Sequence, residues 1–308
     1  MHVLGLIAYV SGFLSTALML GIACMGLNMQ WGKTGLFNVG VAGFMGIGAY
    51  TSALLTTPAS AGAISSLGLP IVVGCFGAML VAGLGSLLVG ALTLRLRTDY
   101  LAITTFGAAV MIQLVLLNAT RYTGGALGFA FIPRPFASIA DQPTLFAVLT
   151  LVLLALIAFG VYSILEQLVH SPWGRVLRAI RDDETAAISL GKNATVYRLQ
   201  AFGVGGALMG LAGALQAHLI GFIAPDDFQA SLTFQIWAML VIGGSGSNAG
   251  ALLGSIVVWG IWSLTGIVTG SVFAAEDQAR AAALRIVMIG VLLCVVLVRR
   301  PRGLLSER

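Results

Sequence analysis

Residues 171–198 read SPWGRVLRAIRDDETAAISLGKNATVYR, the longest polar run in a chain that is otherwise nearly all apolar. The run holds five of the sixteen basic residues of the chain, namely Arg175, Arg178, Arg181, Lys192 and Arg198. Apolar runs on both sides of it are long enough to cross a bilayer, which takes about 20 residues in a helix. Basic residues gather in the cytoplasmic loops between such spans. We therefore expect residues 171–198 to form a cytoplasmic segment that another protein binds.

The composition indicates a membrane protein with many helical spans. Hydrophobic residues make up 58% of the 308 positions and charged residues 9%, whereas a soluble domain carries about 25% charged residues. The apolar runs are continuous, which excludes the alternating pattern of a membrane β-barrel. We expect an all-α polytopic fold with about eight membrane helices, uncertain by two, in a single transmembrane domain over residues 1–308.

The apolar runs place most of these spans directly. We expect spans at 4–25, 71–94, 100–117, 144–165, 199–222, 249–267 and 286–298, with a shorter apolar run at 236–242. Residues 51–69 and 121–143 are predicted loops. The glycines Gly243, Gly244 and Gly246 follow the short run and predict a flexible hinge.

Polar residues at membrane depth mark candidate positions along a solute path. Residues 26–50 carry Asn28 and Asn38 among seven glycines. Polar groups are tolerated at this depth only when they are buried in protein or line a wet cavity. One interpretation is a Gly-rich broken helix, interrupted at Gly32 and Gly35, beside the path; the other is a plain loop between two spans. Two further polar residues, Thr104 and Thr105, complete our candidates for path-lining positions.

The polar segment has the signals of a short amphipathic helix. Ser171 and Pro172 are typical of an N-cap and a first helical position. Leu177, Ile180, Ala187 and Ile188 recur at helical spacing, and Gly191 is the expected stop. Such a helix is either a docking element for a partner or a solvated loop that merely follows the positive-inside rule.

Charge distribution predicts the orientation of the chain. If residues 171–198, Arg95, Arg97, Lys33 and the basic tail at 299–308 are cytoplasmic, that side holds twelve of the sixteen basic residues. The opposite side then keeps Arg121, Arg134, Arg280 and Arg285. This asymmetry favours a cytoplasmic C-terminus and an external N-terminus.

The sequence lacks the usual signatures of catalysis. It contains no Walker A motif, no HExxH and no GxSxG, and Cys24, Cys75 and Cys294 lack the spacing of a disulfide framework or a metal site. His218 is either a packed residue or a proton carrier. No carboxylate is evident within a span, which argues against an ion-coupled carrier. We therefore expect no catalytic residue, no metal and no nucleic-acid partner, with transport energy from a partner subunit or passive flow.

Six segments resemble the LivM-type permease subunit of ABC importers for branched-chain amino acids, and in order they cover almost the whole chain. They are GLNMQWGKTGLFNVGVAGFMGIGAYTSALL (26–55), LRLRTDYLAITTFG (94–107), TGGALGFAFIP (123–133), WGRVLRAIRDDETAAISLGKNATVYRLQAF (173–202), WAMLVIGGSGSNAGALLGS (237–255) and RRPRGLL (299–305). The resemblance implies a bacterial inner-membrane permease that forms half of a translocation path. It further implies a LivH-type second permease, two LivG/LivF-type cytoplasmic ATPases that carry ATP and Mg, and a periplasmic solute-binding protein.

The same resemblance implies a role for the polar segment, which is similar to the EAA loop of importer permeases. Glu184 is displaced by one position from the strict EAA pattern, which puts a direct role for it in doubt. The residues implied to couple the chain to an ATPase are Gly174, Arg175, Leu177, Arg178, Ile180, Arg181, Glu184, Ala186, Ala187 and Gly191. In this interpretation Leu177 and Ile180 are the apolar anchors. The alternatives are a stand-alone secondary transporter or channel and, more remotely, an intramembrane enzyme.

Overall fold

The computed structural model describes residues 2–58, 67–94, 96, 98–139 and 141–272, and near the C-terminal end residues 287, 290, 291, 294, 295, 298 and 303–305. In this part of the chain every named element is a helix, which confirms the predicted all-α fold. The expected span at 286–298, the basic tail, Arg95 and Arg97 lie wholly or mostly outside the described residues.

The described part of the chain contains eleven α-helices, of which eight are apolar and make up the body of the molecule. The helices are α1 (His2–Thr34), α2 (Val41–Thr56), α3 (Ile71–Thr93), α4 (Thr98–Asn118), α5 (Thr120–Thr123), α6 (Pro143–His170), α7 (Pro172–Asp182), α8 (Glu184–Ser189), α9 (Ala194–Ile220), α10 (Ala230–Gly243) and α11 (Asn248–Val272), with 3₁₀ turns η2 (Gly125–Leu127), η3 (Ala137–Ile139) and η4 (Pro225–Phe228). In the described part, six of them are long and apolar enough to cross a membrane, and α2 and α10 are shorter apolar helices.

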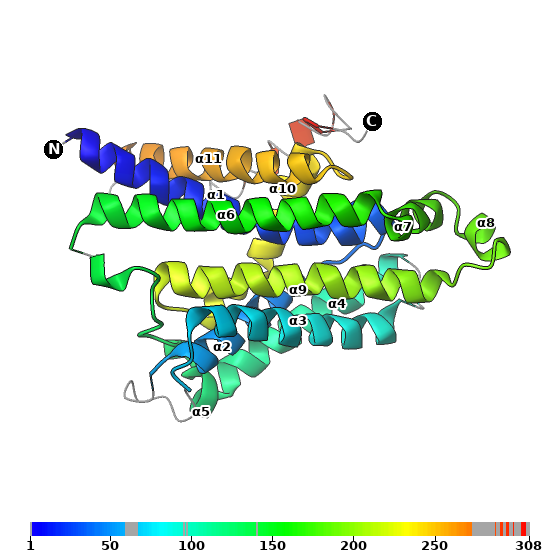
Figure 1. Cartoon of the computed structure of the whole chain (residues 1–308), viewed down its shortest axis with the longest axis horizontal. Coiled ribbons are helices and arrows are strands. Elements are labelled where there is room, and N and C mark those ends of the chain that lie inside the picture. Colours follow the sequence, from blue (N-terminus) through cyan, green and yellow to red (C-terminus); the bar gives the residue numbers. More distant parts are fainter. Residues whose placement is uncertain are drawn as a thin grey trace.

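The long helices lie side by side along the longest axis of the molecule (Figure 1). One end carries α7, α8 and the C-terminus, and we call it the α7 end. The other carries the N-terminus, α5 and the turns around it, and we call it the α5 end. Within this bundle α2 and α10 each cover only part of the length.

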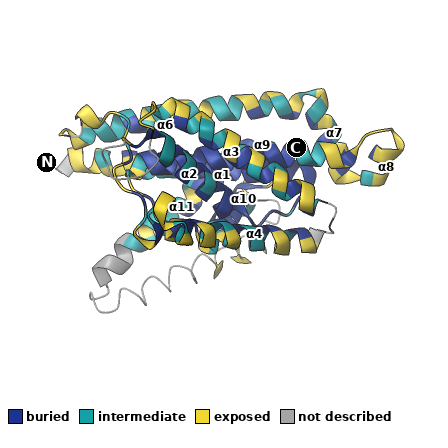
Figure 2. Cartoon of the chain, turned by 90° about the horizontal axis from the view of Figure 1, so that it is seen from below, coloured by how far each residue is buried: buried dark blue, intermediate teal, exposed yellow. Residues whose placement is uncertain are grey.

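Helix α9 forms the centre of the bundle, with 78% of its most apolar window buried, and Figure 2 shows its residues dark blue beneath the outer helices. Its glycines face three different neighbours. A Cβ at Gly205 would meet Gly26 of α1, one at Gly206 would meet Ser86 of α3, and one at Gly213 would meet the carbonyl of Met45 on α2. Small residues at helix contacts let membrane helices approach closely, so the glycine content follows from packing.

The outer face of α3 is a stripe of exposed apolar side chains four residues apart. Its members are Val72, Phe76, Leu80, Leu84, Leu88 and Leu92, each more than half exposed. Lipid is the solvent for such a face in a membrane protein. Figure 2 shows the same pattern on the other outer helices, whose exposed residues are coloured yellow.

The structure corrects the expected break in the N-terminal helix. Helix α1 passes through Gly32 and ends at Thr34, so the break occupies residues 35–40. Within the helix Gly32 permits close packing, since a Cβ there would lie 2.1 Å from Asn28 Oδ1 and 2.5 Å from the Gly246 nitrogen. Gly35 begins the break, and its φ of +73° is a conformation that favours glycine.

Other helix boundaries also differ from the expected ones. Helix α6 continues to His170, five residues past its expected end, and α10 begins at Ala230, six residues before its expected start. Helix α2 continues to Thr56, into the segment predicted as a loop. Helix α9 begins at Ala194, five residues earlier than expected, because the Asn193 side chain accepts a hydrogen bond from the Val196 nitrogen and caps it.

Candidate functional site

The polar segment forms α7 and α8 and joins α6 without a linker. Ser171 ends α6 and caps α7 at once: its hydroxyl donates to the Leu168 carbonyl (2.6 Å) and accepts from the Gly174 nitrogen (3.4 Å). Gly174 is buried, and a Cβ there would lie 2.2 Å from the Val169 carbonyl oxygen. Helix α7 is therefore packed directly against the end of the long helix α6.

The apolar face of α7, which the sequence predicted to anchor a partner, packs against its own chain, and a role of these residues in coupling stays a prediction. Leu177 and Ile180 are 0% and 1% exposed. Ile180 forms a small cluster with Ala187 and Ala194, next to Tyr197, while Leu177 belongs to the main core. Because burial of these two side chains holds α7 in place, they are not free to contact another protein.

The apolar side chains that project from this end belong to α8 and the turn after it. Ile188 is 54% exposed and Leu190 is 80% exposed. Gly191, with a φ of +78°, turns the chain back toward α9. Figure 1 shows α8 standing out beyond the ends of the long helices. Exposed large apolar groups on a protruding tip are typical of a contact surface.

Charged groups hold α8 against the bundle. The Arg198 guanidinium lies 2.7 Å from Glu184 Oε1, joining α9 to α8. The Asp183 side chain accepts from the Ala186 nitrogen (3.0 Å) and caps α8. Glu184 therefore has a positioning role inside this chain, which fits its displacement from the EAA pattern.

The other basic residues of the segment lie on the outside of α7. Arg181 donates to the carbonyl of Gly32 on α1 and pairs with Asp182 (3.1 Å). Arg175 is exposed and donates to the His170 carbonyl (3.4 Å), and Arg178 is half-buried. Arg181 thus ties α7 to the end of α1, beside the break.

A series of hydrogen-bonded polar side chains links three helices at the α7 end. Asn28 on α1 donates to Asn248 Oδ1 (2.9 Å) and accepts from the Gly246 nitrogen (2.7 Å). Asn248 in turn donates to Glu166 Oε1 on α6 (3.1 Å), whose other oxygen lies 3.3 Å from His170 Nε2. These hydrogen bonds connect α6, which continues into α7, with α1 and with the α10–α11 turn.

Glu166 was not singled out in the sequence, because it falls between the predicted span at 144–165 and the polar segment at 171–198. It lies one turn before the end of α6, inside a helix long enough to span the membrane. A glutamate four residues before His170 on a helix was the available signal, since residues at that spacing share a face.

The start of α2, where a broken helix could bind a solute, is already occupied by side chains of this chain. The Val39 nitrogen donates to Thr105 (3.0 Å), the Gly40 nitrogen to Asn38 Oδ1 (2.7 Å) and the Ala42 nitrogen to Thr233 (3.0 Å). These bonds satisfy N–H groups that a helix start otherwise leaves open.

The four predicted path residues differ in burial: three are buried and one is exposed. Asn28, Asn38 and Thr105 are buried, and each is hydrogen-bonded inside the chain. Thr104 is exposed, and its hydroxyl donates to the Tyr100 carbonyl of its own helix (2.7 Å). No cavity found among the described residues brings the four together, and a role on the solute path stays a prediction.

The predicted hinge is a closely packed turn. A Cβ on Gly243 would lie 2.0 Å from the Gly250 carbonyl oxygen, and Gly244 has a φ of +112°. The nitrogens of Leu304 and Leu305 donate to the carbonyls of Ile242 and Gly243 (2.9 Å each). The glycines therefore permit close approach of three segments, while motion at this point stays a prediction.

Comparison with known proteins places the chain beside amino acid permeases. The family described as "Branched-chain amino acid transport system / permease component" matches residues 9–297. The LivM permease protein of the high-affinity branched-chain amino acid system from Salmonella typhimurium is 32% identical over 303 residues, covering 91% of this chain and 66% of that protein. The probable LivM of Methanocaldococcus jannaschii is 27% identical, covering 93% of this chain and 90% of that protein.

The LivH permease protein of S. typhimurium is also similar, 25% identical over 93% of this chain and 91% of its own length. The chain thus spans slightly less than two thirds of the Salmonella LivM and about nine tenths of the LivH protein. No solved structure matches the chain.

Proposed function

The chain belongs to the family of branched-chain amino acid transport system permease components, and from that premise we propose that it is one membrane subunit of an ATP-driven importer. It forms half of a translocation path for branched-chain amino acids or a related small polar solute. Its similarity to both LivM and LivH supports a pair of homologous permeases. ATP and Mg are bound and hydrolysed by two separate ATPase subunits, and an external solute-binding protein delivers the solute.

The observation that carries this proposal is the protruding α7–α8 segment. It presents Ile188 and Leu190 to a partner, while Leu177 and Ile180 hold its base on the bundle. A rigid docking element fits a partner whose own movement must be transmitted. In this proposal, closure of the ATPases displaces α8, and the continuous α6–α7 joint passes that displacement to the membrane helices.

The charge distribution supports placing the α7 end in the cytoplasm of a bacterial inner-membrane protein. Among the described residues the basic side chains of the α7 end are Lys33, Arg175, Arg178, Arg181, Lys192 and Arg198. The α5 end carries Arg121 and Arg134. Because basic loops stay on the cytoplasmic side, the C-terminus is cytoplasmic and the N-terminus external.

Purification of the chain from its own membranes under mild conditions tests the proposal. We expect a second permease of similar size and two ATPase subunits to copurify, and the reconstituted complex to accumulate a branched-chain amino acid only with ATP. A chain that purified alone and moved solute without ATP would overturn the proposal and leave a channel or secondary transporter.

Substitutions of Glu166 distinguish an ATP-driven importer from an ion-coupled carrier. Glu166→Gln keeps an oxygen that accepts from Asn248 but removes the titratable group, so we expect uptake within about twofold of the native complex. Glu166→Leu leaves the Asn248 amide without its acceptor, which costs about 1–3 kcal/mol, and we expect a lower thermal midpoint. Uptake in proteoliposomes and thermal unfolding measure the two effects. Loss of uptake in the glutamine variant, with unchanged stability, would indicate a proton-coupled carrier.

A further inference from the structure

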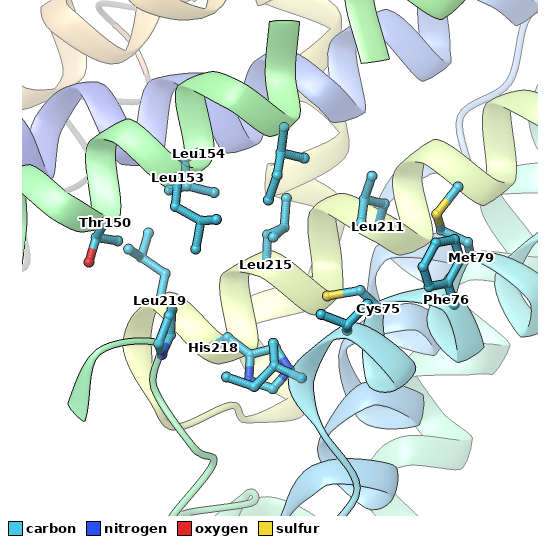
Figure 3. Close-up of a pocket in the computed structure, with 14 residues that line it drawn as sticks. Cys75, Phe76, Met79, Thr150, Leu153, Leu154, Leu211, Leu215, His218 and Leu219 are labelled. Carbon is cyan, nitrogen blue, oxygen red and sulfur yellow. The ribbon is translucent and has the colours of Figure 1, made fainter. Parts of the chain in front are cut away.

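A cavity of about 370 Å³ lies between α3, α6 and α9 near the α5 end, away from the features assigned above. Figure 3 shows side chains from the three helices converging on it. The lining is almost wholly apolar and includes Cys75, Phe76, Met79, Leu154, Leu211 and Leu215. An apolar cavity of this size does not hold ordered water, and left empty it would weaken the packing around it.

The two polar side chains of the lining have partners within the chain. His218 Nδ1 lies 2.7 Å from the carbonyl oxygen of Pro133, which can only accept, so this nitrogen donates. Its Nε2 lies 2.8 Å from the Ser52 hydroxyl. The Thr150 hydroxyl donates to the carbonyl of Phe146 (2.8 Å). The lining offers no charged group to either end of a zwitterionic amino acid, so the body of the cavity fits an apolar ligand and not the transported solute.

The rims of the cavity are bilayer-facing surfaces. Val72 and Phe76 line it from α3, and both belong to the exposed apolar stripe of that helix. On the α6 side, Leu156 and Phe159 are 65% and 68% exposed. The opening thus lies between two lipid-exposed helices that are long enough to span the membrane, where acyl chains are the most abundant apolar molecules.

A basic residue marks the α5 end of the cavity. Pro135 and Leu219 line the cavity, and their neighbours Arg134 and Ile220 are joined by a hydrogen bond from the Arg134 guanidinium to the Ile220 carbonyl. Arg134 is exposed, and a guanidinium has five N–H donors. Arginine binds phosphate oxygens through paired donors, so its position fits the headgroup level of a lipid whose chain enters the cavity.

We propose that this cavity binds one phospholipid of the bilayer, with an acyl chain among Cys75, Met79 and Leu215 and the phosphate at Arg134. The lipid fills the space between α3 and α6 and is retained longer than the lipids around it. This inference requires only that the chain lies in a bilayer, and it stands or falls independently of the importer assignment.

Photolabelling with a retained lipid tests the site. The complex is reconstituted in vesicles containing phosphatidylglycerol with a diazirine in its acyl chain, extracted in detergent, washed to remove loosely held lipid, irradiated and mapped by peptide mass spectrometry. We expect labels on the cavity residues of α3, α6 and α9, and at least fivefold fewer on Leu84 and Leu88 of the exposed stripe.

Filling the cavity should remove the label. Leu153→Trp and Cys75→Phe each place a larger side chain in the lining, and we expect either to reduce cavity labelling at least fivefold; Leu88→Trp, on the exposed face, is the matched control. Arg134→Gln should reduce retention of the phospholipid but not of a diazirine-bearing diacylglycerol. Labels spread evenly over exposed residues, no retained lipid, or crosslinks from the cavity to a second permease would each overturn the proposal.

Discussion

Aspartate at both Ile188 and Leu190 is expected to reduce ATP-driven uptake at least tenfold while the chain stays folded in the membrane. These two side chains are the large apolar groups exposed at the tip of α8 and the turn after it. Full burial of a Leu or Ile side chain contributes about 1.5–3 kcal/mol, and about 1.4 kcal/mol corresponds to tenfold in affinity. Two charges at such positions should therefore release the ATPase subunits.

Uptake into proteoliposomes and copurification of the ATPases measure this effect. Ser189→Asp is the matched control, because Ser189 is exposed between the two residues and adds a charge without removing an apolar group. We expect the control to keep most of the uptake. If the double variant kept native uptake and native ATPase binding, the tip of α8 would not be the coupling surface.

Ile180→Asp should behave differently from the α8 variants. Ile180 is 1% exposed and packs with Ala187 and Ala194, so a carboxylate there is buried without a partner and destabilises the segment. Loss of uptake in that variant would therefore report misfolding of α7. The α8 variants separate docking from folding because their side chains have few internal contacts to lose.

Local sequence rules predicted where the helical part of the polar segment begins and where it stops. Ser171 followed by Pro172 is a cap followed by a residue whose fixed φ suits the first helical position, and the structure places both as expected. Gly191, with a positive φ, follows α8 at the predicted stop, but the break at Asp183 that divides the predicted helix into α7 and α8 was not predicted. The cap and the stop depend on a few neighbouring residues, so they can be read without knowledge of the fold.

The partner of an apolar face could not be predicted in the same way. The spacing of Leu177 and Ile180 indicates that α7 has an apolar face, but periodicity does not say whether that face meets its own chain or another protein. Packing against another helix determines the partner of this face, because Ala194 and Tyr197, which lie next to Ile180, belong to α9. Ile188 recurs at the same helical spacing, and only the structure shows that it is exposed, together with Leu190 in the turn after α8.

The roles of two glycines and the partner of one buried asparagine also could not be predicted from the sequence. Gly32 and Gly35 look alike in sequence, yet Gly32 permits the approach of Gly246 and Gly35 supplies a positive φ. The sequence predicted a path-lining role for Asn28, which stays a prediction, but did not show that Asn248, 220 positions away, is its hydrogen-bond partner. Contacts between distant segments determine both outcomes, and a single sequence does not show them.

Gly213→Ala is expected to lower the yield of folded chain and to destabilise it by about 3 kcal/mol or more, at or above the usual range for overpacking. A Cβ at Gly213 would lie 1.9 Å from the Met45 carbonyl oxygen. The obstructing atom is backbone in α2, so no side-chain rotation relieves the clash and α2 and α9 have to separate. Gly48 faces Gly210 across the same contact at 2.1 Å, which leaves no room on the other side.

Gly160→Ala is the matched control, because Gly160 lies in the long helix α6 and a Cβ there meets nothing within 4 Å. Alanine favours a helix over glycine by about 1 kcal/mol, so the control should be neutral or slightly stabilising. Size-exclusion profiles after heating give the apparent midpoint of each variant. Equal midpoints for the two alanine variants would show that α2 and α9 can separate at little cost. The bundle would then lack a rigid centre to support α7 and α8.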